Sequence, residues 1–162
     1  MNVTELRELD LTAVRQLLSR YELELIQLGD DAVIPASFWG EPEAGLAGRC
    51  VFVRGDTPAH SLLHEACHYI CMTAGRRDAL WRDAGGNDDE ESAVCYLQVL
   101  LADAIPGLGR DRVFRDLDAW GYSFREGCAR SWFDGDGRAS QRWLESNGLI
   151  DAAGEPTWEL RP

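Results

Sequence analysis

The sequence contains no long apolar run. None of its segments approaches the roughly 20 apolar residues that a membrane-spanning helix requires. Charged residues recur throughout the first stretch, MNVTELRELDLTAVRQLL, where a secretory signal peptide would need an apolar core. We therefore expect neither a membrane partner nor a cleaved leader.

Basic residues and cysteines are also few. The chain has 16 Lys and Arg residues against 28 Asp and Glu residues, and its formal net charge is −12. A protein of this charge repels phosphate backbones, so nucleic acid is not expected as a partner. The 5 cysteines are an odd number, and Cys67, Cys71 and Cys95 lie within apolar runs. Reduced, buried thiols of a cytoplasmic protein fit this pattern better than a disulfide framework does.

The length and the apolar pattern predict one α+β domain. A chain of 162 residues can bury a core of its own, so a single domain over 1–162 is expected. Apolar residues at helical spacing predict a first helix near 12–21. Strands are expected within 21–28 and 49–54, and the arginine at each end of the second suits a sheet edge.

Two longer helices are predicted after these strands. The first is expected at about 58–74. The second, at about 88–103, is apolar on nearly every side and is therefore expected to be buried. Shorter helical segments follow between about 106 and 162. The order of helix, small sheet and further helices is typical of an α+β domain.

All 3 histidines lie in the first long helix, and two of them form the pattern His64-Glu65-Ala66-Cys67-His68. Positions i and i+4 share one face of a helix, so both imidazoles can hold one metal ion. Glu65 is adjacent to His64, so its carboxylate can flank the metal and accept a proton from a metal-bound water, whose pKa zinc lowers to about 7. These ligands and the general base form the HExxH signature. A metal also explains why three ionisable side chains occur in an otherwise apolar helix.

A third protein ligand is needed, because a catalytic zinc ion usually has three and keeps one position open. No histidine follows His68, so this ligand is expected to be a carboxylate or a thiolate. The acidic start of the second long helix is the best source. Glu91 is preferred because it leaves the apolar face of that helix free for the core, and Glu90 is the alternative. Acidic residues are, however, favoured in any first helical turn.

The motif and the helix that opens with Glu91 resemble the gluzincin side of the zincin metallopeptidases. The order of elements over about 10–103 is similar to the minigluzincins and to the zincin domain of ImmA/IrrE-type peptidases. This resemblance implies a zincin-like core with an N-terminal helix, a small twisted sheet, the HExxH helix and an antiparallel glutamate helix, followed by a helical C-terminal region at about 106–162.

The resemblance also implies an activity and a site. It implies one Zn²⁺ per chain held by His64, His68 and Glu91, with Glu65 as the general base in hydrolysis of a peptide or protein substrate. The substrate would lie along the strand at 49–54.

Two features of the gluzincin pattern are missing. Larger gluzincins often have an Asp four residues after the ligand glutamate, which orients the first histidine, but this position is Cys95. No oxyanion donor can be assigned from the sequence, although Tyr122 is a candidate and His60 could line the cleft or serve as the donor. A zincin-like metal-binding and interaction module without catalysis is therefore the alternative function.

A lesser alternative comes from Glu126-Gly127-Cys128. Peptide deformylases, which are also HExxH metalloenzymes, take their third ligand from the Cys of a Glu-Gly-Cys segment. In that family the segment precedes the HExxH helix, whereas here it follows it by about 60 residues. Cys128 is thus the ligand of a deformylase-like metallohydrolase hypothesis.

Overall fold

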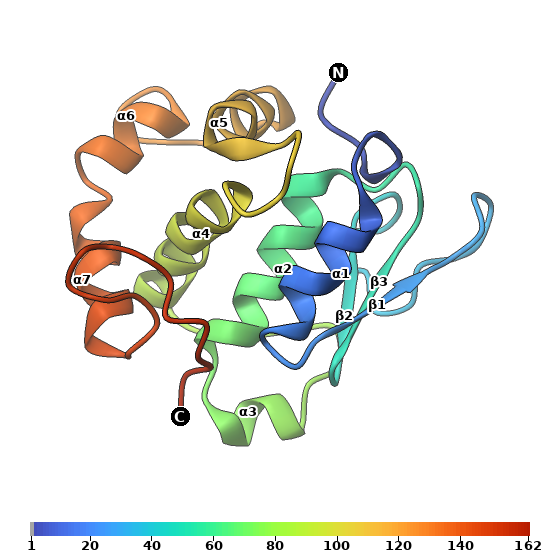
Figure 1. Cartoon of the computed structure of the whole chain (residues 1–162), viewed down its shortest axis with the longest axis horizontal. Helices are drawn as coiled ribbons and strands as arrows, with labels where there is room; N and C mark the ends of the chain where they lie inside the picture. The colour runs from blue at the N-terminus through green and yellow to red at the C-terminus, as the bar shows by residue number, and fades with distance from the viewer. Residues whose placement is uncertain (1) are drawn as a thin grey trace.

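The computed structural model describes residues 2–162 (Figure 1). This part of the chain contains a three-stranded sheet, seven α-helices and one short 3-10 helix. In chain order these elements are the 3-10 helix (Leu6–Glu8), α1 (Leu11–Ser19), β1 (Glu24–Gln27), β2 (Gly45–Ala47), β3 (Cys50–Val53), α2 (Ala59–Cys71), α3 (Ala74–Asp78), α4 (Asp88–Ala102), α5 (Gly109–Trp120), α6 (Ala129–Asp134) and α7 (Arg138–Ser146). The predicted α+β class is confirmed.

The sheet has the strand order β1-β3-β2. β3 pairs with β1 in parallel and with β2 in antiparallel fashion, and Val51 lies between Leu25 and Leu46. These three side chains are buried, so one face of the sheet belongs to the core. The prediction that the strand at 49–54 lies at a sheet edge is therefore wrong. Its two arginines do not mark an edge, because both stand outside the paired residues Cys50–Val53.

α2 and α4 are antiparallel and pack against each other in the middle of the molecule (Figure 1). α2 also contacts β2 and β3, so it is enclosed on two sides and most of its residues are buried. α4 matches the predicted helix at 88–103 closely. α2 ends before the predicted position 74, because Met72 and Thr73 adopt extended backbone angles and the short helix α3 follows.

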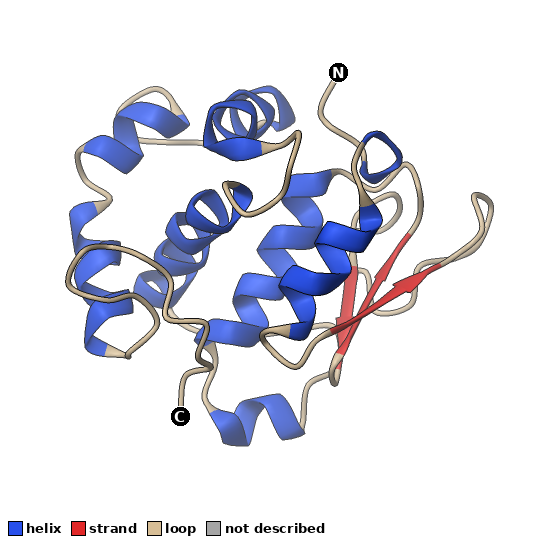
Figure 2. Ribbon diagram, in the orientation of Figure 1, coloured by secondary structure: helices blue, strands red, loops and turns tan. Residues whose placement is uncertain are grey.

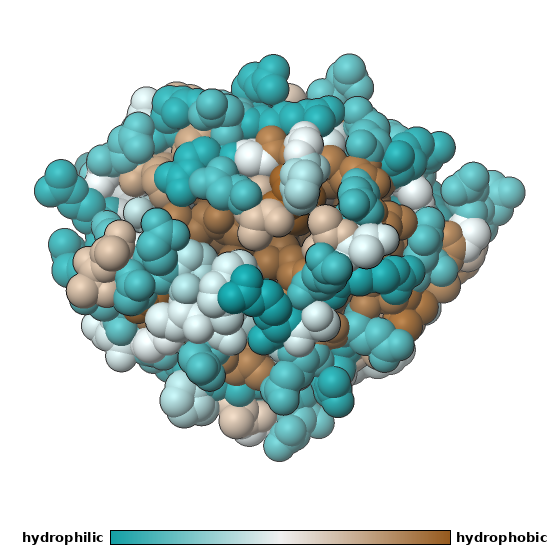
Figure 3. Space-filling view, viewed as in Figure 1, coloured by the Kyte–Doolittle hydropathy of each residue, from teal (hydrophilic) through white to brown (hydrophobic). Residues whose placement is uncertain are grey.

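The C-terminal helices cover the other side of α4. Figure 2 shows the strands gathered at one side of the molecule and the helices at the other. One hydrophobic cluster extends from Leu6 to Ile150 and includes residues of both the sheet and the C-terminal helices. In Figure 3 hydrophobic residues are visible at the centre of the molecule and toward its right side, with hydrophilic residues around and between them. None of the helices within 2–162 combines the length and the apolarity needed to cross a membrane.

Candidate metal centre

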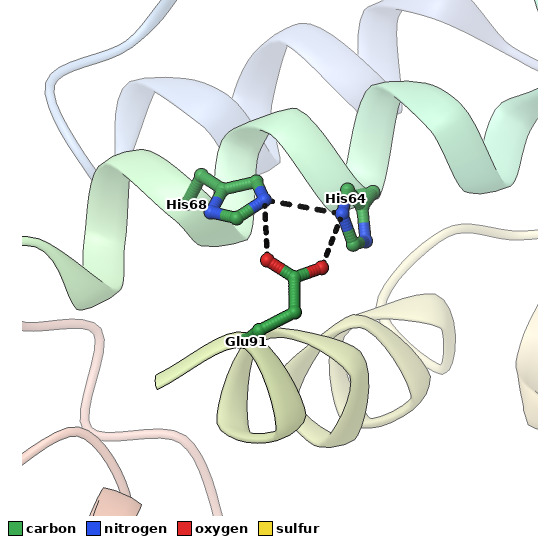
Figure 4. Close-up of side chains that lie close together, drawn as sticks. All are labelled: His64, His68 and Glu91. Atoms are coloured by element: carbon green, nitrogen blue, oxygen red, sulfur yellow. Dashed lines mark hydrogen bonds and ion pairs between the residues drawn. The ribbon is translucent and has the colours of Figure 1, made fainter. Parts of the chain in front are cut away.

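Two histidine side chains of α2 point toward the same position beside the helix (Figure 4). His64 and His68 are one turn apart, and their Nε2 atoms are separated by 3.1 Å. Their side chains are only 15% and 11% exposed. The helix holds both rings on one face, as the HExxH pattern predicts, at the border between the core and the surface.

Glu91 reaches the same position from the first turn of α4 (Figure 4). Its Oε1 lies 3.1 Å from Nε2 of His64, and its Oε2 lies 3.2 Å from Nε2 of His68. Asn87 caps α4 by accepting a hydrogen bond from the backbone N–H of Glu90, which fixes the start of the helix and hence the position of Glu91. The three side chains offer ligand atoms that all lie within 4.8 Å of one another.

The spacing of these atoms fits a metal ion. Ligands about 2.0–2.1 Å from a tetrahedral zinc ion are about 3.3 Å apart, close to the 3.1 Å between the two Nε2 atoms. Two imidazole nitrogens and a carboxylate are also a common donor set for catalytic zinc. Lone pairs that converge in this way repel one another unless protons or a cation lie between them, so the group could hold a cation.

Charge within the group changes the pKa of its members. Burial raises the pKa of the Glu91 carboxyl, but hydrogen bonds from His64 and His68 lower it by more, so its pKa lies well below the ordinary value. Burial lowers the pKa of His64, while Tyr122, Cys95 and Glu91 together raise it above its ordinary value. Glu91 is therefore ionised at neutral pH, which is the form that binds a metal.

Gln98 orients His64, a role that the sequence did not reveal. The side chain of Gln98 is fully buried on α4, seven residues after Glu91. Its Nε2 donates a hydrogen bond to the carbonyl oxygen of His60 at 2.7 Å, so its Oε1 faces Nδ1 of His64 at 3.3 Å. An acceptor at this point holds the proton of His64 on Nδ1 and leaves the lone pair of Nε2 for a metal.

The position four residues after Glu91 is Cys95, and it is Gln98, seven residues after Glu91, that faces Nδ1 of His64. A glutamine on the same face as the ligand glutamate, within an otherwise apolar stretch, was the signal in the sequence that could have identified it.

Glu90 is occupied elsewhere. Its side chain is 4% exposed and binds Arg76 through both carboxylate oxygens, each at 2.7 Å. Arg161 of the C-terminal segment adds a third contact at 3.0 Å. The alternative in which Glu90 is the metal ligand is therefore not supported by the geometry, whereas Glu91 lies beside both histidines.

A cleft is lined in part by His64, His68 and Glu91, which we call the metal group. On the side of His68 its lining includes Phe38, Arg82 and Asp83, and on the side of His64 it includes Glu43, Trp120 and Tyr122. The volumes of these two halves are about 210 Å³ and about 530 Å³. The ligand residues, Glu65 and Trp39 contribute to the cleft, so the group is open to a molecule of considerable size.

Glu65 lines both halves of this cleft. Burial raises the pKa of its carboxyl, His64 and His68 act in the opposite direction, and Glu43 and Glu91 raise it further. The net result is a pKa above the ordinary value, which brings the carboxylate closer to the proton affinity that a general base needs near neutral pH. Its position and its electrostatics both suit the predicted role.

Tyr122 and His60 differ in their access to the cleft. Tyr122 follows the end of α5 and lines the larger half. His60 is fully buried, its ring centroid lies 5.2 Å from that of Trp120 and 5.6 Å from that of Tyr122, and neither ring nitrogen has a hydrogen-bond partner within the described residues. The prediction that His60 lines the cleft is therefore wrong, because these two aromatic side chains, distant in the sequence, cover it.

The edge strand beside the cleft is β2, not the predicted strand at 49–54. The backbone N–H of Ala44, just before β2, donates to the hydroxyl of Ser61 on α2. The outer side of β2 is partly occupied, since Arg82 donates its backbone N–H to the carbonyl of Leu46 at 2.9 Å. An extended substrate therefore cannot pair with all of this strand while that hydrogen bond is in place.

Cys128 is not brought to the histidines. It precedes α6, and its Sγ donates a hydrogen bond to the hydroxyl of Ser131 at 3.2 Å. The group of potential ligands found within 2–162 consists of His64, His68 and Glu91 without a cysteine. The geometry therefore does not support the deformylase-like arrangement.

Comparison with protein-family models, with curated proteins and with solved structures gives no match for this chain. The function of the site must therefore be argued from its own geometry.

Proposed function

We propose that the protein is a zinc-dependent metallopeptidase of the gluzincin type, with His64, His68 and Glu91 as ligands. The observation that carries this proposal is the convergence of two Nε2 atoms and one carboxylate at 3.1–3.2 Å, at a cleft that Glu65 also lines. The HExxH pattern alone predicts only two ligands and a base. The third ligand comes from a different helix, and this independent contribution makes a chance arrangement of the histidines a poor explanation.

The residues of the chain have distinct roles in this proposal. When bound, zinc would supply a Lewis acid that polarises the scissile carbonyl and makes water acidic. Glu65 accepts the proton of the attacking water and then delivers it to the leaving amine. Tyr122 lines the larger half of the cleft, and its hydroxyl is suited to stabilising the developing oxyanion. Gln98 keeps His64 in the tautomer that binds the metal.

The test is a digest of a mixed-peptide library by zinc-loaded wild type and by Glu65→Gln, with cleavage read by mass spectrometry. This substitution removes the base but no ligand and little volume, so the variant should fold and bind zinc normally. Hydrolysis should fall by about 10² to 10⁴, the usual contribution of one acid–base group.

The control outcomes separate the functional classes. Equal cleavage by both forms would identify a contaminating protease. Zinc binding without cleavage of any peptide by wild type would favour the non-catalytic metal-binding module instead. Absence of stoichiometric zinc would contradict both functions.

A further inference from the structure

The larger half of the cleft contains a carboxylate that the proposed hydrolytic chemistry does not use. Glu43 lines this half together with Trp39, Trp120 and Tyr122. Its Oε1 accepts a hydrogen bond from the indole N–H of Trp120 at 2.8 Å. We call these four residues the Glu43 pocket.

The backbone around Glu43 is held firmly in place. The hydroxyl of Ser37 donates to the carbonyl oxygen of Glu43 at 3.0 Å, and the next backbone N–H, of Ala44, donates to the hydroxyl of Ser61 at 2.9 Å. These bonds fix the backbone on both sides of the residue, and the hydrogen bond from Trp120 holds its carboxylate at the cleft.

No cationic side chain balances Glu43 within residues 2–162. It forms no ion pair, whereas Glu90 and Asp56 have arginine partners. Its bond to Trp120 is made through one oxygen, and this donor is neutral. The remaining oxygen has no donor from the described part of the chain.

The charge of this half of the cleft is one-sided. Glu43, Glu65 and Glu91 line it, and its lining includes no arginine. The opposite half shares Glu65 and Glu91 but also contains Arg82, which offsets the charge of Asp83. The negative potential is therefore stronger on the side of Tyr122, where no arginine offsets it.

Aromatic rings complete the pocket. Trp39 is 78% exposed, and Trp120 and Tyr122 are only partly buried, so their rings are accessible from the cleft. Aromatic faces attract organic cations through their quadrupoles, and a preorganised carboxylate adds a charge-assisted hydrogen bond. Together they form a surface suited to an ammonium or guanidinium group.

We propose that the Glu43 pocket binds a cationic group of the substrate, so that peptides with a positive charge close to the scissile bond are preferred. The cation is either a basic side chain or a free N-terminal ammonium group, which share the same chemistry. This inference rests on the proposed peptidase function for its biological meaning. The binding property belongs to Glu43 itself, however, and can be measured without zinc or turnover.

The variant Glu43→Gln separates recognition from structure. A glutamine keeps an oxygen that accepts the hydrogen bond of Trp120, and it has nearly the same volume, but it lacks the charge. A purely structural role of Glu43 therefore predicts little change, whereas cation binding predicts a clear loss. Asp83→Asn, in the opposite half of the same cleft, is the matched control for removal of one negative charge.

The indole N–H resonance of Trp120 is the reporter, followed by NMR titration in metal-free and in zinc-loaded protein. The probes are N-acetyl-lysine methylamide, N-acetyl-norleucine methylamide and norleucine methylamide with a free amino group. At least one cationic probe should bind about 10-fold more tightly than the neutral one, as expected for a hydrogen bond to a charged group. Tighter binding of the lysine probe would identify a basic side chain as the cation, and tighter binding of the free-amino probe would identify the N-terminal ammonium group.

In Glu43→Gln this preference should shrink to within about twofold, while Asp83→Asn should keep it. Equal affinity for charged and neutral probes in wild type, or an unchanged preference in Glu43→Gln, would overturn the inference. Neither result would affect the Glu65-dependent cleavage assay, so failure of this inference and failure of the peptidase proposal are distinguishable.

Discussion

Replacing Glu90 by Gln should destabilise the protein without weakening zinc binding. The same change at Glu91 should weaken zinc binding with little effect on stability. The two residues are neighbours in the first turn of α4, and both were candidates for the third ligand. Glu90 lies inward between two arginines, while the Glu91 side chain is 50% exposed beside the histidines. The two variants therefore test whether Glu90 stabilises the fold while Glu91 binds the metal.

The expected loss at Glu90 follows from its contacts. Removing one partner of a fully buried ion pair costs about 3–5 kcal/mol. Here Arg76 and Arg161 are 34% and 24% exposed and can regain water, which reduces the penalty to about 2–3 kcal/mol. In a chain of this size each kcal/mol lowers the melting temperature by about 2–4 °C, so Tm should fall by about 4–12 °C.

The assay is urea unfolding of the metal-free proteins at pH 7, followed by titration with zinc against a chelating indicator. Glu91→Gln should change the metal-free unfolding free energy by less than about 1 kcal/mol, as for other exposed charges, but weaken zinc more than about 100-fold. If Glu90→Gln instead loses zinc and keeps its stability, the ligand assignment is wrong.

Three further results are expected. Gln98→Leu should weaken zinc by about 10–100-fold, as measured by competition with an indicator, because His64 loses the acceptor that fixes its tautomer. Burial, assisted by His64, lowers the pKa of His60 to about 3. Between about pH 6.5 and 3 the unfolded chain therefore binds a proton that the folded protein excludes. As the pH decreases through this range, the free energy of unfolding should decrease by up to about 1.4 kcal/mol per pH unit. His60→Leu should flatten this part of the unfolding curve, and an unchanged slope would contradict the assignment. Cys128→Ser should leave zinc stoichiometry unchanged in elemental analysis, since Cys128 lies outside the metal group.

The helices and the candidate ligand residues could be predicted because local signals determine their positions. Apolar spacing and an acidic first turn identified the two central helices to within a few residues, and the motif placed His64 and His68 on one face. Glu91 was favoured over Glu90 on helical geometry alone. The physical basis of that choice lies in Arg161, near the end of the chain, whose contact with Glu90 no local pattern predicts.

The features that sequence reasoning missed all depend on contacts between distant segments. The strand Cys50–Val53 became central because β1 and β2 both pair with it, and strand order has no local signature. His60 is buried because Trp120 and Tyr122 fold over it. Gln98 acquired its role only when α4 packed against α2, which brought its amide to His64.

Zinc K-edge X-ray absorption of the purified protein is the most direct test of the proposed metal centre. A site built from His64, His68 and Glu91 predicts one zinc ion per chain, a first shell of only nitrogen and oxygen at about 2.0–2.1 Å, and outer-shell scattering from two imidazoles. A sulfur shell at about 2.3 Å, or the absence of stoichiometric zinc, would contradict it.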